Sequence, residues 1–266
     1  MTEDSAGLSG GVNDPGPAST ADRISLMLLL GAGACYLAVT IAKQPILVAL
    51  IGGLGAADGE TILSKHALRV QLLSLALLLP AVLLLGLDTG RPRSLVRASL
   101  KVHRRLFVFG FVVALAVSFV LNALGAWPFT WRWPGSTAAP YARVLLEHSQ
   151  FSAICIWAVT SVLIIPVLEE AVFRVGVLRG LAAWTGSPRL AIIASSLLFG
   201  TLHLGTFWRP DTAHLVNSFW IFAASLVVGH TTVRDAGNAS VALGSHVARN
   251  AIEFTLLFVA IGGAPR

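Results

Sequence analysis

Seven apolar runs recur along this chain of 266 residues, each close to the length that a helix needs to cross a bilayer. A spanning helix takes about 20 mostly apolar residues, and in lipid its backbone groups must be satisfied within the segment. The runs are 24–42, 68–87, 106–126, 151–168, 190–208, 215–233 and 239–262. The sequence therefore predicts an all-α, polytopic transmembrane bundle of seven spans, with an eighth possible at the shorter, glycine-containing run 45–57.

Composition supports a membrane protein over a soluble one. Charged residues make up 12% of the chain and the mean hydropathy is +0.77, whereas soluble domains carry about 25% charged residues. So much apolar surface also excludes disorder over most of the chain. Cys35 and Cys155 both lie in apolar runs, which argues against a disulfide framework or a cysteine-based metal site.

The charge pattern predicts how the chain lies in the membrane. The net charge is +6, and the segment 88–105 holds six basic residues with Asp88 as its only acid. Short loops this basic stay in the cytoplasm. We therefore expect an integral, multi-pass protein of the cell membrane with the 88–105 loop in the cytoplasm. A headgroup-binding patch is compatible with this topology, and we expect no nucleic-acid partner.

Three regions follow from this reading. Residues 1–23 are rich in Gly, Ser, Pro and Ala with four acids, which predicts a disordered acidic tail. Residues 24–149 would form the N-terminal transmembrane helices and an interfacial loop rich in tryptophan, the residue that gathers at bilayer surfaces. Residues 150–266 would form a transmembrane core in which ionisable residues lie inside apolar runs.

Ionisable residues inside the later runs are the main functional signal, since lipid penalises each unpaired charge by several kcal/mol. Glu170 and Arg174 lie four apart, so they share a helix face and can form an ion pair. Glu169 points about 100° away, so one acid can be held by the arginine while the other faces a cavity. The alternative is a helix end at the membrane surface with ordinary solvated charges, which Pro166 just upstream makes reasonable.

Two further groups follow in the next runs. His203 ends an apolar stretch, with Phe199 one turn earlier. His246 and Asn250 are four apart and project together, as do Arg249 and Glu253. Taken singly, His203 is also explained as a packed core histidine. His246 and Asn250 are also explained as polar contacts between helices.

One water-filled cavity shared by all three groups explains them together. A carboxylate in such a site can act as a general base, and a histidine can orient water through one ring nitrogen while the other is held. Asparagine and histidine N–H groups can donate to an oxyanion. The set is therefore suited to hydrolysis.

The order Glu169-Glu170-x-x-x-Arg174, Phe199-x-x-x-His203, His246-x-x-x-Asn250 resembles the CPBP family of intramembrane peptidases. That family includes the type II CAAX prenyl endopeptidases and the Abi proteins, and the resemblance covers about residues 150–262. It implies an all-helical peptidase with a cavity open to the cytoplasm. Glu169 and His203 would activate water, and His246 and Asn250 would stabilise the oxyanion. Glu170 and Arg174 would be a supporting pair, and Phe199 would shape the cavity wall. Val175 stands where family members commonly have glycine, which bears on local packing.

The resemblance favours a mechanism without a metal. Zinc is the alternative, with Glu169, His203 and His246 as ligands, although the chain has no HExxH motif and no obvious carboxylate to support each histidine. The expected substrate is a peptide or a lipidated, CAAX-like protein tail that reaches the site from the bilayer. A transporter and a non-proteolytic immunity scaffold are the rival functions, and the sequence leaves the oligomeric state open.

Overall fold

The protein is described by a computed structural model that covers residues 20–52, 59–90, 101–123, 146–147, 150–203, 212–235 and 237–262. The predicted disordered tail and the tryptophan-rich loop fall almost wholly outside these ranges. Throughout the described residues the chain forms helices and turns with no strand, which confirms the all-α prediction. Three long helices come first along the chain: α1 (Thr20–Gly52), α2 (Gly59–Thr89) and α4 (Arg104–Ala123). After the central helical run, the chain continues with α9 (Pro188–Thr201), α10 (Thr212–Arg234) and α11 (Ser240–Gly262).

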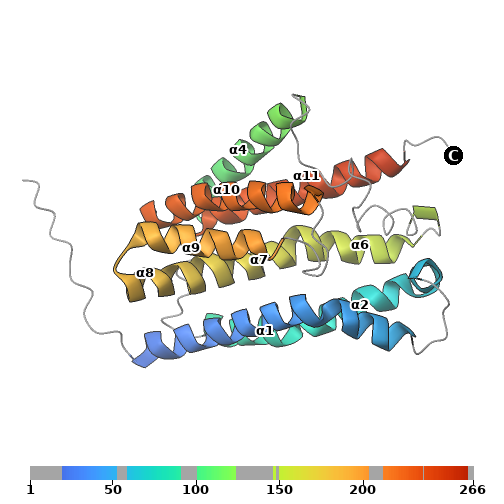
Figure 1. Ribbon diagram of the computed structural model, residues 1–266, viewed down its shortest axis with the longest axis horizontal. Helices are drawn as coiled ribbons and strands as arrows, with labels where there is room; N and C mark the ends of the chain where they lie inside the picture. The colour runs from blue at the N-terminus through green and yellow to red at the C-terminus, as the bar shows by residue number, and fades with distance from the viewer. Residues whose placement is uncertain are drawn as a thin grey trace, which may run out of the picture.

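One long helical run crosses the middle of the bundle (Figure 1). It consists of α6 (Phe151–Val159), η2 (Thr160–Ile164), α7 (Ile165–Glu170), η3 (Ala171–Leu178) and α8 (Arg179–Thr185). Both η segments are π-helical, a wider winding that occurs mostly as short insertions and often at functional sites. The run confirms that the apolar stretch 151–168 continues as a charged helix through Glu169 and Glu170.

The other helices pack on either side of this run. In Figure 1, α1 and α2 lie side by side along one long edge of the bundle, with α9 beside α8 and α10 and α11 beyond them. Leu29 and Tyr36 of α1 pack with Phe173 of η3 and Phe199 of α9 in the main buried cluster. Val175 is buried in the same cluster, so the valine in place of the family's glycine is accommodated by the packing.

Four helices of the described residues are long and apolar enough to cross a membrane. They are Arg23–Ala42, Ala67–Asp88, Phe151–Thr185 and Leu215–Arg234. Large apolar side chains such as Phe109 and Phe119 on α4 are exposed on the bundle surface, as expected where lipid is the solvent. The structure supports an integral membrane protein, and the count of seven to eight spans stays a prediction.

Several predicted boundaries were wrong. Residues 45–52 continue α1 without a break instead of starting a separate span, and the first helix begins at Thr20, inside the predicted tail. The predicted span 190–208 is a helix of only 14 residues that ends at Thr201. Its last turn tightens, since the backbone N–H of His203 donates to the Gly200 carbonyl (3.0 Å). His203 therefore lies just past the helix end, whereas the predicted span 190–208 includes it within the helix.

The predicted basic loop is also shorter than expected at both ends. Asp88 belongs to α2 and is fully buried, where it accepts a hydrogen bond from Ser25 of α1. Arg104 and Arg105 belong to the first turn of α4. Residues 91–100 lie outside the described ranges. The acid that was counted as part of a cytoplasmic loop therefore ties α1 to α2.

Helices α4 and α11 meet through glycines. A Cβ built on Gly244 of α11 would run into the Phe107 carbonyl oxygen of α4, and a Cβ on Gly110 would run into the Val241 carbonyl oxygen. Small residues allow this close backbone approach between membrane helices. The packing matters for the site because α11 also carries His246 and Asn250.

Replacement of Gly244 by alanine should destabilise the protein, since the added methyl group can be accommodated only if α4 and α11 separate. Overpacking of this kind costs about 1–3 kcal/mol, and unfolding of the detergent-solubilised protein would measure it. Gly180 of α8 is the matched control because a Cβ there meets nothing within 4 Å. There alanine should be neutral or slightly stabilising. Equal unfolding free energies for Gly244→Ala and Gly180→Ala would contradict this prediction.

Candidate active site

The two adjacent carboxylates lie at the junction of α7 and η3, inside the bundle. Glu170 and Arg174 form the predicted ion pair (Glu170 Oε2 to Arg174 Nε, 3.1 Å), with side chains only 2% and 1% exposed. Glu169 is also buried. The alternative of a surface helix end with solvated charges is therefore wrong. Burying two charges this deeply has a large desolvation cost, which is offset only where additional hydrogen bonds satisfy the polar atoms that the pair leaves free.

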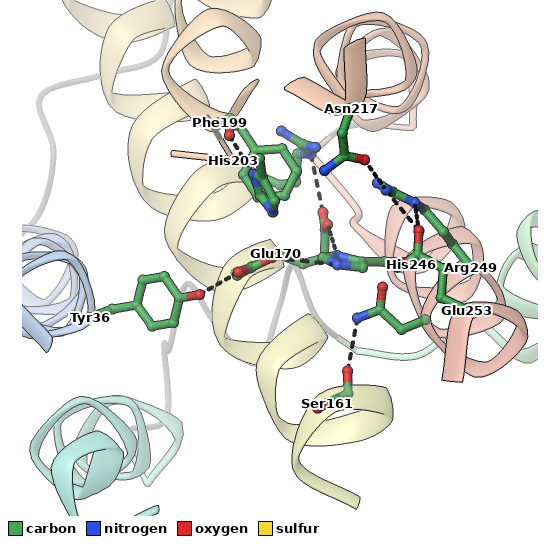
Figure 2. Close-up of polar contacts among 12 residues, drawn as sticks. Tyr36, Ser161, Glu170, Phe199, His203, Asn217, His246, Arg249 and Glu253 are labelled. Carbon is green, nitrogen blue, oxygen red and sulfur yellow. Dashed lines mark hydrogen bonds and ion pairs between the residues drawn. The ribbon is translucent and has the colours of Figure 1, made fainter. Parts of the chain in front are cut away.

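His246 of α11 supplies such a hydrogen bond, and it bridges both carboxylates (Figure 2). Its Nδ1 lies 2.9 Å from Oε1 of Glu170 and its Nε2 lies 3.4 Å from Oε2 of Glu169. An ionised carboxylate only accepts hydrogen bonds, so the ring donates to Glu170 through Nδ1. The Nε2 contact is longer than an ordinary hydrogen bond of 2.7–3.2 Å, which leaves that end of the ring loosely held.

The remaining oxygen of Glu169 is taken by a residue that sequence reasoning missed. The hydroxyl of Tyr36, on α1, donates to Glu169 Oε1, and Figure 2 shows it reaching in from the opposite side to His246. The available signal was a phenol inside an apolar run, since a buried tyrosine hydroxyl usually finds a polar partner. The sequence could not name that partner, which lies 133 residues away.

His203 approaches the same network from the end of α9. Its Nδ1 lies 2.8 Å from the Phe199 carbonyl oxygen, and since a carbonyl can only accept, Nδ1 carries the proton. In the neutral ring Nε2 is then a free acceptor. His203 interacts electrostatically with both Glu169 and His246, so the two predicted histidines and the acid share one region.

Phe199 forms the wall between these groups. Its ring centroid lies 4.9 Å from that of His203 and 6.0 Å from that of His246. The Arg174 guanidinium carbon lies 5.1 Å from the Phe199 centroid, a cation–π contact. The structure thus places Phe199 in contact with three of the predicted site residues.

Asn250 lies one turn after His246 on α11 but is bonded elsewhere. Its side-chain amide donates to the backbone carbonyl oxygen of Ser161 in η2 (2.8 Å). An asparagine amide has two N–H donors, so one remains after this bond. The predicted pair Arg249–Glu253 also forms (2.9 Å), and Arg249 in addition donates to Asn217 of α10 (3.2 Å).

The contacts of the candidate zinc ligands bear on the zinc alternative. Among the residues that the structure describes, no group of three or more His, Cys, Asp or Glu side chains is placed to hold a metal ion. Both ring nitrogens of His246 face carboxylates. The sequence showed no obvious supporting carboxylate for each histidine, and the structure places Glu170 in that position for His246. These contacts suit proton transfer between acid and imidazole.

Comparison with known proteins gives one match, to a family model. Residues 151–252 match a family model described as type II CAAX prenyl endopeptidase Rce1-like. The match, which covers less than half of the chain, confirms the predicted resemblance of this segment to the CPBP family. No curated protein and no solved structure matches the chain. All three motifs lie within the matched segment, whereas Tyr36 lies outside it.

Proposed function

We propose that the protein is an intramembrane endopeptidase that hydrolyses a peptide bond in a membrane-associated or lipidated, CAAX-like substrate. The observation that carries the proposal is the buried network of Glu169, His246 and Glu170, with the free acceptor nitrogen of His203 beside it. A general base, an orienting imidazole and N–H donors are the groups that peptide hydrolysis needs. They converge here from three different helices.

The reaction would use each group for one step. Glu169 takes a proton from a water that the His203 Nε2 orients, and the water oxygen attacks the scissile carbonyl carbon. With a proton on each ring nitrogen of His246, its loosely held Nε2–H and the second N–H of Asn250 donate to the resulting oxyanion. The proton then passes from Glu169 to the leaving nitrogen and the C–N bond breaks, which yields a carboxylate and an amine. Glu170 and Arg174 hold His246 and balance the charge.

The membrane setting completes the proposal. The protein would be a multi-pass protein of the cell membrane with seven to eight spans, and its basic 88–105 segment would face the cytoplasm. The site would open to that side and admit a peptide or a lipidated protein tail from the bilayer. Zinc bound by Glu169, His203 and His246 is the alternative mechanism. We propose the metal-free one because the family resemblance favours it and because, among the residues that the structure describes, no group of three or more His, Cys, Asp or Glu side chains is placed to hold a metal ion.

Cleavage of defined peptides in proteoliposomes tests the proposal. Wild-type protein would be given a farnesylated CAAX peptide, the same peptide without the lipid, and an unrelated transmembrane peptide. Mass spectrometry of the products identifies the bond that is broken. Cleavage of at least one peptide at a single bond supports the endopeptidase proposal. The rate of cleavage after exhaustive chelation then separates the two mechanisms: an unchanged rate supports the metal-free mechanism, and a lost rate supports the zinc one. No cleavage of any of them would contradict the proposal for this substrate class.

His203→Ala should lower the rate of cleavage about 10²–10⁴-fold, the range for losing a group that assists proton transfer. The reason is that the Nε2 of His203 is the acceptor proposed to orient the attacking water, and alanine offers no group that can replace it. His230→Ala is the matched control, since His230 is exposed on α10 and should be replaceable without effect. Equal rates for both variants would remove His203 from the mechanism.

A further inference from the structure

Tyr36 lies far from the three motifs in sequence, yet it touches the acid at their centre. It is buried in α1 and its hydroxyl donates to Oε1 of Glu169, while His246 faces the other oxygen, Oε2. Each oxygen of the proposed base therefore has its own partner, from two helices on opposite sides (Figure 2). The His246 contact, at 3.4 Å, is longer than an ordinary hydrogen bond, so the hydrogen bond from Tyr36 is the contact that restrains rotation of the carboxylate about its last bond.

The packing of α1 fixes where this hydroxyl sits. Gly33, one turn before Tyr36, brings α1 so close to η3 that an added Cβ would lie 3.4 Å from Val172. Leu29 and the Tyr36 ring are buried in the same cluster as Phe173. The ring thus anchors α1 on η3, and the hydroxyl is the only part of the side chain that the packing leaves for a polar role.

We infer that Tyr36 is a positioning residue that holds the proposed base Glu169 in its reactive orientation through a hydrogen bond. This inference rests on the proposed peptidase function and extends its site beyond the matched segment, residues 151–252. The N-terminal helices then complete the site as well as support it. Hydrogen bonds to charged groups are among the stronger ones in proteins.

Tyr36→Phe tests the inference because it removes the hydroxyl and keeps the ring that packs α1 on η3. We expect kcat for the cleaved peptide to fall about tenfold, equivalent to about 1.4 kcal/mol, with KM unchanged. A loss confined to kcat indicates an interaction that acts in the transition state. A purely structural role would instead lower the melting temperature and the amount of active protein.

Ser74→Ala is the matched control. Ser74 lies on α2 with its side chain buried, and its hydroxyl donates to the Val70 carbonyl oxygen of the same helix (2.8 Å), so the loss of this hydroxyl should leave kcat unchanged. In the Glu169→Gln background the Tyr36→Phe change should add no further loss, since coupled residues are non-additive. Independent losses would overturn the inference, as would a Tyr36→Phe variant at the wild-type rate. If wild type itself cleaved no peptide, the peptidase proposal and this inference would fall together.

Discussion

Glu169→Gln should reduce peptide cleavage by about three orders of magnitude or more, near the upper part of the range for a general base. The amide is nearly the same size as the acid and can still accept the hydrogen bond from Tyr36, so packing around α1 and η3 should survive. It cannot take a proton from water. The loss should therefore appear in kcat, with little change in KM or in the melting temperature.

Initial rates in proteoliposomes measure this effect, with the melting temperature in detergent as a check on folding. Glu253→Gln is the matched control, because it makes the same chemical change on α11 at a half-exposed carboxylate that pairs with Arg249. It should cleave at the wild-type rate. A Glu169→Gln enzyme as fast as this control would show that another group activates the water.

The parts of the site that helical periodicity governs could be predicted from the sequence. Glu170 with Arg174, and Arg249 with Glu253, are pairs four residues apart on one helix, and both form. The same spacing put His246 and Asn250 on one face of α11, where both reach the central helical run. Such contacts depend only on 3.6 residues per turn.

The contacts between helices could not be predicted, because they depend on how the helices pack. The bond from Tyr36 to Glu169 joins residues 133 apart, and that from His246 to Glu170 joins residues 76 apart. Asn250 was expected to be free for catalysis, yet one of its donors is bonded to Ser161 in the π-helical segment η2. No local pattern in the sequence marks that carbonyl as available.

Arg174→Met should be the most destabilising of the substitutions considered, because it leaves Glu170 buried without its cation. Breaking a buried ion pair by removing one partner costs about 3–5 kcal/mol. His246 would remain as the only partner of Glu170 and would be drawn toward it. The free energy of unfolding in mixed micelles measures the loss, and cleavage should fall with it, since His246 would lose its alignment.

The chain contains a natural control for this effect. Arg249 and Glu253 form an ion pair with the same spacing of four residues, but their side chains are 26% and 34% exposed, against 1% and 2% for Arg174 and Glu170. Exposed pairs contribute about 0–1 kcal/mol, so Arg249→Met should have little effect on stability. Similar losses for both arginine variants would mean that burial does not set the strength of the inner pair.

A double variant, Glu170→Gln with Arg174→Met, separates the stabilising role of this pair from its role at the site. Removing both charges together avoids an unpaired ion, and such replacements are often close to neutral for stability. We therefore expect the double variant to recover most of the stability that Arg174→Met loses. Cleavage should stay low, because a neutral amide holds the His246 ring less firmly than a carboxylate does. If cleavage recovered along with stability, the charge on Glu170 would be needed only to neutralise Arg174, and its proposed part in orienting His246 would be wrong.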